Sequence, residues 1–465
     1  MNMINVRRLA VMTFLGAGML SDISAQDFSL QADTLNEARL PAQWDLQSCI
    51  DYALEQNITI RKNRVTAAST QIDVKTAKAA LFPSLSFSTS QQVVNRPYQE
   101  TSSRVSGSEI ISSNSKTSYN GNYGLNASWT IYNGSKRLKT LKQERLNNQV
   151  AELDVATSEN TIKESIAQIY IQILYAAESV RVNENTLQVS IAQCDRGQEL
   201  LNAGSIAKSD FAQLEAQVST DRYQLVTAQA TLQDYKLQLK QLLELDGENE
   251  MNVYLPKLSD ENVLAPLPAK KDVYVSALAI RPEIEASKLN IEASELGIDI
   301  AKSSYFPTIS LSAGIGTNHT SGSDFTFGEQ VKNGWNNSIG LSVSVPIFNN
   351  RQTKSAVQKA KLQRETNMLS LLDEQKALYK TIESLWLDAN SAQQRYAAAN
   401  EKLRSTQISY DLISEQFNLG MKNTVELLTE KNNLLQAQQE QLQAKYMAIL
   451  NTQLLKFYQG DKLTL

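Results

Sequence analysis

Few side chains in this chain have the type and spacing that enzyme chemistry requires. The 465 residues include one histidine, His319, and two cysteines, Cys49 and Cys194, which lie far apart without a CxxC spacing. We find no HExxH, GxSxG or Walker-type sequence and no carboxylate pair in a recognisable pocket. The sequence therefore predicts no catalysis, no cofactor and no metal site, and both cysteines are expected to be isolated small apolar side chains.

Two aspartates lie at the same distance along the chain from a following glycine, and this shared spacing indicates a repeated pair of elements. Asp195 lies nine residues before Gly204, and Asp411 lies nine residues before Gly420. This spacing belongs to a longer repetition. AKAALFPSLSFS begins at residue 77 and AKSSYFPTISLS at residue 301, an offset of 224 residues, whereas LNAG (201–204) and FNLG (417–420) differ by 216. The chain is therefore predicted to be a tandem duplication whose change in spacing falls in a loop.

Each copy of the repeat has the same predicted order of elements. A short helix and a second helix end at Phe-Pro, because proline disfavours helical geometry in the residue before it. A strand, a polar loop, a second strand and two long helices follow. The first unit (45–250) has helices 45–56 and 58–81, strands 84–94 and 122–132, and a helical hairpin over 135–246. A linker (251–270) follows. The second unit (271–460) has helices 271–280 and 282–305, strands 308–316 and 338–348, and a helical hairpin over 351–458, and a tail (461–465) ends the chain.

The N-terminus has the features of an export signal. Arg7 and Arg8 precede an apolar run that ends at Leu20, and a small-residue cleavage site follows, so residues 1–25 are predicted to be a secretory signal peptide and 26–44 an N-terminal tail. The apolar run is too short to span a bilayer. No cysteine follows the cleavage point, so an acyl anchor there is not supported. Net charge of −4 makes nucleic acid an unexpected partner.

The four strands share one rhythm, apolar and small polar residues in alternation. In YGLNASWTIYNG (123–134), Leu125 and Trp129 alternate with small polar residues, as Leu341 and Val343 do in the last strand. We expect the apolar residues to face lipid, because the other face carries almost no charge and strands of this length fit the wall of an outer-membrane barrel. Since four strands cannot close a barrel and open edges are not tolerated in lipid, several chains must share one barrel.

The helices are longer than a compact domain needs. A helix over 135–201 measures about 100 Å. Apolar residues step by three and four along 225–242, as in a coiled coil. Gly204 and Gly420 stand where each helical hairpin must turn, and glycine accepts the left-handed conformation common at helix ends.

In this order, the duplicated motifs resemble the TolC family of outer-membrane efflux proteins over about residues 45–460. The resemblance rests on the two Phe-Pro junctions, the strand ends WTIYNG (129–134) and VPIFN (345–349), and the tips LNAG and FNLG, each followed six residues later by an acid, Asp210 or Glu426. It implies a mainly α fold with a membrane sheet. Three chains would form a 12-stranded β-barrel joined to a long periplasmic α-helical barrel in a Gram-negative outer membrane.

The resemblance also implies partners and site residues. The homotrimer would dock by its hairpin tips onto a periplasmic adaptor (a membrane fusion protein) linked to an inner-membrane pump of the RND or ABC type. Tip roles fall on Leu201, Gly204, Phe417 and Gly420. Family members narrow their entrance with aspartate rings, a role that carries over to Asp411, with Asp195 at the matching position of the first unit. A solvated surface carboxylate explains Asp411 equally well.

The function implied is that of an exit duct. Small toxic compounds or polypeptides would pass outward through it in a tripartite efflux or type I secretion system. The alternative is an exported coiled-coil structural protein or adhesin without a channel. That class needs long helices but has no need of four amphipathic strands paired by duplication.

Overall fold

The computed structural model describes residues 41–98, 102–106, 109–113, 116–246, 251–256, 263–321, 323 and 325–464. The expected signal peptide and most of the N-terminal tail lie outside these ranges, as does part of the linker. Trp44 and Val253 form a parallel bridge in a small separate unit. All elements named below belong to the larger unit.

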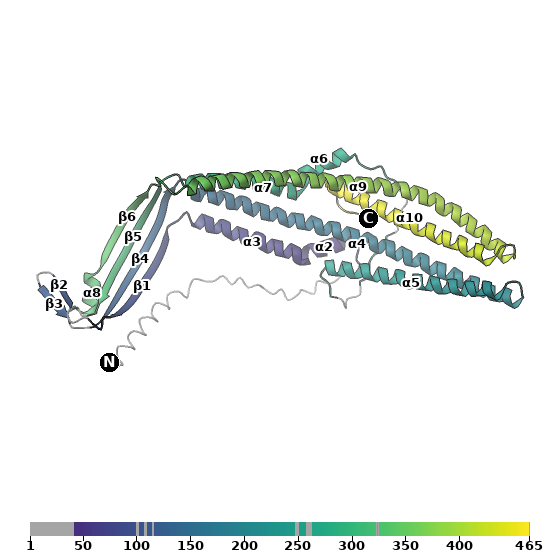
Figure 1. Ribbon diagram of the computed structural model, residues 1–465, viewed down its shortest axis with the longest axis horizontal. Coiled ribbons are helices and arrows are strands. Elements are labelled where there is room, and N and C mark those ends of the chain that lie inside the picture. Colours follow the sequence, from purple (N-terminus) through teal and green to yellow (C-terminus); the bar gives the residue numbers. More distant parts are fainter. Residues whose placement is uncertain are drawn as a thin grey trace. The chain divides into compact units, whose positions relative to one another are not determined.

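The element order confirms the predicted duplicated, mainly helical fold with one membrane-type sheet (Figure 1). The first half contains α2 (Leu46–Gln56), α3 (Ile58–Ala79), β1 (Ser84–Asn95), β2 (Ser102–Ser106), β3 (Glu109–Ser113), β4 (Thr117–Asn133), α4 (Lys136–Asn202) and α5 (Lys208–Leu242). The second half contains α6 (Lys270–Ile280), α7 (Pro282–Ser303), β5 (Thr308–Thr320), α8 (Phe327–Asn333), β6 (Asn336–Ser344), α9 (Gln352–Asn418) and α10 (Thr424–Gln459). The long helices α4 and α9 each have 67 residues.

The four long strands form one antiparallel sheet in the order β1-β4-β5-β6. Its register aligns the two halves. Leu125 lies opposite Phe87 on one side and Ile315 on the other, and Leu311 lies opposite Leu341. Apolar residues of all four strands therefore share one face. Strands β1 and β6 each have a partner on one side only, so the sheet is open at both edges.

The strand ends differ from the predicted boundaries in ways that the alternation does not reveal. β4 begins at Thr117 and β5 continues to Thr320, whereas β6 ends at Ser344, before Pro346, which has no amide hydrogen to donate. A bulge between Thr130 and Tyr132 shifts the register, so that Tyr132 lies opposite Ile309.

The predicted polar loops also contain regular structure. The hairpin β2–β3 lies within 95–120, and α8 lies within 317–336, where Thr326 and Glu329 form a capping box. His319, expected in the second loop, lies on β5, with its ring 5.1 Å from those of Tyr119 and Phe327. The alternation weakens towards the outer ends of β4 and β5, which explains why these two strands were predicted too short.

Polar contacts join the helices to the sheet. The indole Nε1 of Trp129 donates to the carbonyl of Leu81 at 2.8 Å, and Arg137 Nη1 donates to that of Ala80 at 2.6 Å. Both acceptors lie directly after the end of α3, so β4 and α4 are each joined to the segment that leads from α3 to β1. Gly134 has φ of +68°, and a Cβ there would lie 2.7 Å from the carbonyl oxygen of Ser303 at the end of α7. A side chain at 134 is therefore excluded by conformation and by space.

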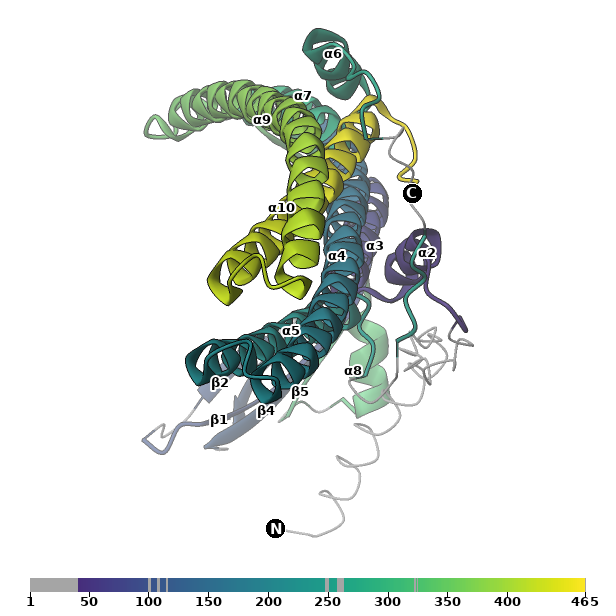
Figure 2. The ribbon, with the colours of Figure 1, turned by 90° about the vertical axis from the view of Figure 1, so that its right-hand side faces the viewer.

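The helices lie side by side in a curved layer (Figure 2). Helix α4 contacts α3 and α7, α7 contacts α9, and each long helix contacts its hairpin partner, α5 or α10. One core cluster joins α4, α9 and α10 around Ile171, Tyr396 and Leu454. Another joins α6, α7, α9 and α10 around Val273, Ile382 and Leu455. Over the described ranges, no helix combines the length and apolarity that crossing a membrane requires.

Candidate functional site

The hairpin tips turn on the two predicted glycines. Gly204 has φ of +71° and Gly420 of +73°, and the next amide, Ser205 or Met421, donates back to the carbonyl of Leu200 (2.8 Å) or Gln416 (2.9 Å). This is the Schellman pattern that satisfies the last carbonyls of a helix. No heavy atom lies within 4 Å of a Cβ placed at either glycine. The glycines are therefore required for backbone conformation and not for space.

The other tip residues divide between interior and surface. Phe417 is 3% exposed and packs inside the second hairpin, whereas Leu201 is half-buried. The side chains of Leu419 and Met421 are 71% and 70% exposed. The apolar surface of the second tip is therefore formed by Leu419 and Met421, to which no role had been assigned, and not by the buried Phe417.

The acidic residues that follow the tips begin the returning helices. Glu426 accepts from the amide of Asn423 at 3.2 Å, and Asn423 Oδ1 accepts from the amide of Glu426 at 2.9 Å, a capping box at the start of α10. Asp210 accepts from the amide of Ala207 at 3.4 Å. The hydrogen bonds from Lys422 and from the Asn423 amide hold the pKa of Glu426 below its usual value. The repeated acid thus has a structural role in both halves.

Asp195 and Asp411 are exposed on α4 and α9. Asp411 Oδ1 accepts from Gln407 Nε2 at 2.9 Å, one turn earlier on the same helix. Asp195 belongs to the first hairpin and Asp411 to the second. The pore-lining role of these aspartates stays a prediction. Within the described ranges, no group of three His, Cys, Asp or Glu side chains is placed to hold a metal ion.

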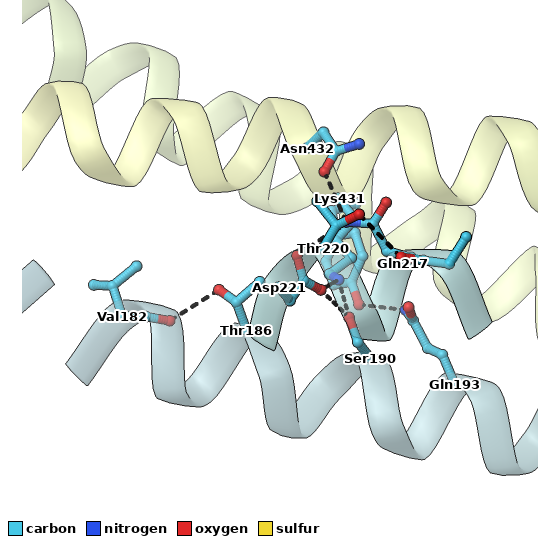
Figure 3. A network of polar contacts seen from close by, with 11 residues as sticks. Val182, Thr186, Ser190, Gln193, Gln217, Thr220, Asp221, Lys431 and Asn432 are labelled. Atoms are coloured by element: carbon cyan, nitrogen blue, oxygen red, sulfur yellow. Dashed lines mark hydrogen bonds and ion pairs between the residues drawn. The ribbon is translucent and has the colours of Figure 1, made fainter. Parts of the chain in front are cut away.

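A buried charged cluster joins the two hairpins (Figure 3). Lys431 of α10 donates to Asp221 of α5 and to Ser190 of α4, and Ser190 also donates to Asp221. These three residues, here called the Lys431 cluster, are 3%, 1% and 2% exposed in the order Lys431, Asp221 and Ser190. Burial lowers the pKa of Lys431, and its hydrogen bond and ion pair with Asp221 oppose that shift.

Further polar contacts surround the cluster. Gln217 Nε2 donates to Asp221 Oδ1 at 2.9 Å and lies 3.4 Å from Asn432 Oδ1, so it bridges α5 and α10. Gln193 of α4 donates to the hydroxyl of Tyr410 of α9 at 2.8 Å. Polar side chains therefore connect α5 to α10 and α4 to α9 at points beyond the Lys431 cluster.

Sequence reasoning missed the Lys431 cluster although a signal was present. Lys431 lies four residues after Leu427 and three before Leu434, both buried on the same stripe of α10. Asp221 lies seven residues after the buried Leu214. A charge at a seam position of a coiled coil indicates a buried polar contact.

The sheet has two faces of different chemistry. On the apolar face, Leu125 and Trp129 are each 39% exposed, and Leu341 and Val343 are 65% and 58% exposed. The opposite face carries small or polar residues in register, for example Ser86, Asn126, Gly314 and Ser338. Helix α8 contacts β5 near the outer end of the sheet, whereas β1 and β6 are exposed along nearly their whole length. The lipid-facing role of the apolar residues stays a prediction.

The family model described as "Outer membrane efflux protein" matches residues 49–244 and 273–460, one segment in each half of the duplication. The chain belongs to this family. Family membership places it in the outer membrane. Since the two matched segments coincide with the duplicated units, the family assignment covers the sheet and both hairpins.

Individual relatives are distant. The chain is 25% identical over 294 residues to outer membrane efflux protein BepC of Brucella suis biovar 1 (strain 1330), covering 63% of this chain and 61% of BepC. It is 24% identical over 341 residues to outer membrane protein TolC of Escherichia coli (strain K12), covering 70% and 66%. The matches thus span less than two thirds of either relative. The crystal structure of CusC aligns with a TM-score of 0.76 at 19% identity, over 90% of this chain and 93% of CusC, and shares the fold.

Proposed function

We propose that three copies of this chain form the exit duct of a tripartite efflux or type I secretion system. Small toxic compounds or polypeptides would leave through it. The observation that carries the proposal is a sheet with one exposed apolar face and two open edges. Open edges are not tolerated in lipid, so β6 of one copy pairs with β1 of the next, and three copies give twelve strands, within the range of closed membrane barrels.

The duplication also supports closure at the helices. Within the chain, α4 packs on α7. Their counterparts in the duplication are α9 and α3, which lie at the two sides of the layer. Val65 and Ile72 of α3 are 68% and 53% exposed, and Leu362 and Leu369 of α9 are 63% and 60% exposed. We expect α9 of one copy to pack on α3 of the next as α4 packs on α7.

The tips supply the surface for a partner. Leu419 and Met421 expose apolar side chains beside Gly420, at the end of the hairpin remote from the sheet. A periplasmic adaptor, itself linked to an RND or ABC pump, is the partner proposed for this surface. The duct has no chemistry of its own in this proposal, since transport is driven by the pump.

A planar-bilayer recording tests the proposal. Protein purified in detergent and added to the bilayer should give uniform stepwise conductance increases. Protein whose apolar sheet face carries charges, such as Leu125→Arg with Leu341→Arg, should give none. Absence of steps from the unmodified protein, together with its extraction from cells without detergent, would favour the exported scaffold instead.

A further inference from the structure

The groove between α9 and α10 has no occupant within the described chain. It measures about 550 Å³, and its lining includes Ser391, Arg395, Ala399, Glu440, Ala444 and Asn451. Asn451 is 5% exposed, yet its Nδ2 has no hydrogen-bond partner among the described residues. The groove is therefore a volume that the described chain leaves unfilled, beside a buried amide that lacks a partner.

The first half of the chain contains the filled counterpart of this groove. Helix α10 lies over the groove between α4 and α5. Gln439 accepts from Ser179 at 3.0 Å, and the ring of Tyr446 lies 6.3 Å from that of Tyr175. Adding the repeat offset of 216 residues converts Tyr175 and Ser179 into Ser391 and Arg395, both of which line the empty groove. The two grooves are therefore equivalent sites of the duplicated fold.

The same offset identifies the missing occupant. Subtracting 216 from Gln439 and Leu442 of α10 gives Tyr223 and Val226 of α5. Leu442 is 8% exposed because it is covered within the chain, whereas Tyr223 and Val226 are 74% and 58% exposed. Helix α5 thus presents uncovered side chains at the positions that α10 uses for packing.

We infer that Tyr223 and Val226 of one copy fill the α9/α10 groove of the next copy, with Tyr223 against Arg395. This inference rests on the ring of copies proposed above, and it specifies the contact that joins the hairpins of neighbouring copies. The small side chains Ala398 and Ala399 leave room for a tyrosine ring. The Arg395 guanidinium can stack on that ring, a favourable cation–π arrangement.

Two joints between hairpins then exist, one between the two hairpins of a chain and one between hairpins of neighbouring copies, and they differ in chemistry. The counterparts of Ser190, Asp221 and Lys431 are Thr406, Ala437 and Glu215, so the joint between copies lacks the buried ion pair of the joint within a chain. The contact between copies is an aromatic and apolar insertion. The contact within a chain is fixed by the Lys431 cluster.

Cysteine crosslinking in outer-membrane vesicles tests the inference, in a Cys49→Ser, Cys194→Ser background. Tyr223→Cys with Arg395→Cys should form covalent dimers and trimers on oxidation. Tyr223→Cys with Gln394→Cys, which moves the second thiol to the next face of α9, is the matched control and should crosslink at least tenfold less. Ser179→Cys with Gln439→Cys calibrates the reaction, because this pair should join within one chain without changing its mass.

A second pair separates failure of this contact from failure of the ring. Ser128 of β4 pairs with Ser312 of β5, where the two units of the duplication meet. The counterparts of these residues are Ser344 of β6 and Ser88 of β1, so Ser88→Cys with Ser344→Cys should crosslink β1 of one copy to β6 of the next. Trimers from the sheet pair alone, or equal crosslinking by the Arg395 and Gln394 pairs, would overturn the contact and leave the ring intact. No covalent oligomer from either site, with the calibrating pair formed, would overturn both.

Discussion

At the scale of single residues, Lys431 and Asp221 place charges where neighbouring turns bury leucine. A buried ion pair contributes little net stability relative to apolar residues of the same size, because both charges lose hydration. Removing one partner is different, since it leaves the other charge buried and alone. The cluster therefore specifies the register of the hairpins more than it strengthens their contact.

We expect Lys431→Met to destabilise the protein by about 3–5 kcal/mol, because Asp221 remains buried without its cation. Thermal unfolding in detergent, followed by circular dichroism, measures the change. The double variant Lys431→Met with Asp221→Leu is the control and should recover most of the loss. If Lys431→Met unfolds at the same temperature as the unmodified protein, water must solvate Asp221, and the pair is not a buried ion pair.

Asp411 gives a prediction about conduction. If three copies of this exposed carboxylate line the pore, they form a cation-binding constriction. Asp411→Ala should then raise single-channel conductance and reduce block by divalent cations. Asp195→Ala is the matched variant at the same position of the first hairpin. Unchanged conductance and block in Asp411→Ala would return this residue to the class of solvated surface carboxylates.

Glu426 gives a prediction about pH. Its pKa is lowered from 4.5 in the folded protein, so its contribution to the start of α10 is present above pH 4.5 and is lost as pH falls through the lower folded value. Hydrogen-exchange protection factors of the first turn of α10 should fall over this acidic range. Glu426→Ala, which cannot accept from the Asn423 amide, should show low protection throughout this pH range. Equal pH dependence in the two proteins would contradict the capping role.

At the scale of elements, the two faces of the sheet differ in polarity, because one carries apolar side chains and the other carries small or polar ones. Leu125 and Asn126 are neighbours on β4 but point to opposite faces, and their partners across the strands keep this division. Burying an arginine at the lipid-facing midplane of a barrel costs about 2–4 kcal/mol. The cost is absent for a residue that faces a watery lumen.

We therefore expect Leu125→Arg to reduce the folded, membrane-inserted fraction far more than Asn126→Arg. The heat-modifiable band on cold gel electrophoresis of outer membranes measures this fraction. Equal losses in the two variants would reverse the assignment of the faces.

The sequence determined some elements better than others, for physical reasons. Helix ends at Phe-Pro and at Gly204 and Gly420 were predictable because proline and left-handed glycine act locally. The bulge after Thr130, the outer ends of β4 and β5, and helix α8 were missed because they depend on pairing across strands or on a short polar segment. The Lys431 cluster was missed because its members come from three helices that only the fold brings together.

At the scale of the whole molecule, the single chain is incomplete in a consistent way. The sheet has two open edges, α3 and α9 expose apolar side chains, and the α9/α10 groove is empty while Tyr223 is exposed. In each case the duplication contains a filled counterpart inside the chain. One rotation that repeats the internal contacts between copies would satisfy all three surfaces, which is the property of a closed cyclic assembly.

The number of copies in that assembly tests the central claim most directly. Protein extracted from outer membranes in detergent should give, by native mass spectrometry, a particle of three copies, since three times four strands closes the barrel. A stable particle of one copy would contradict the account, because its sheet edges and apolar face would then remain uncovered in lipid.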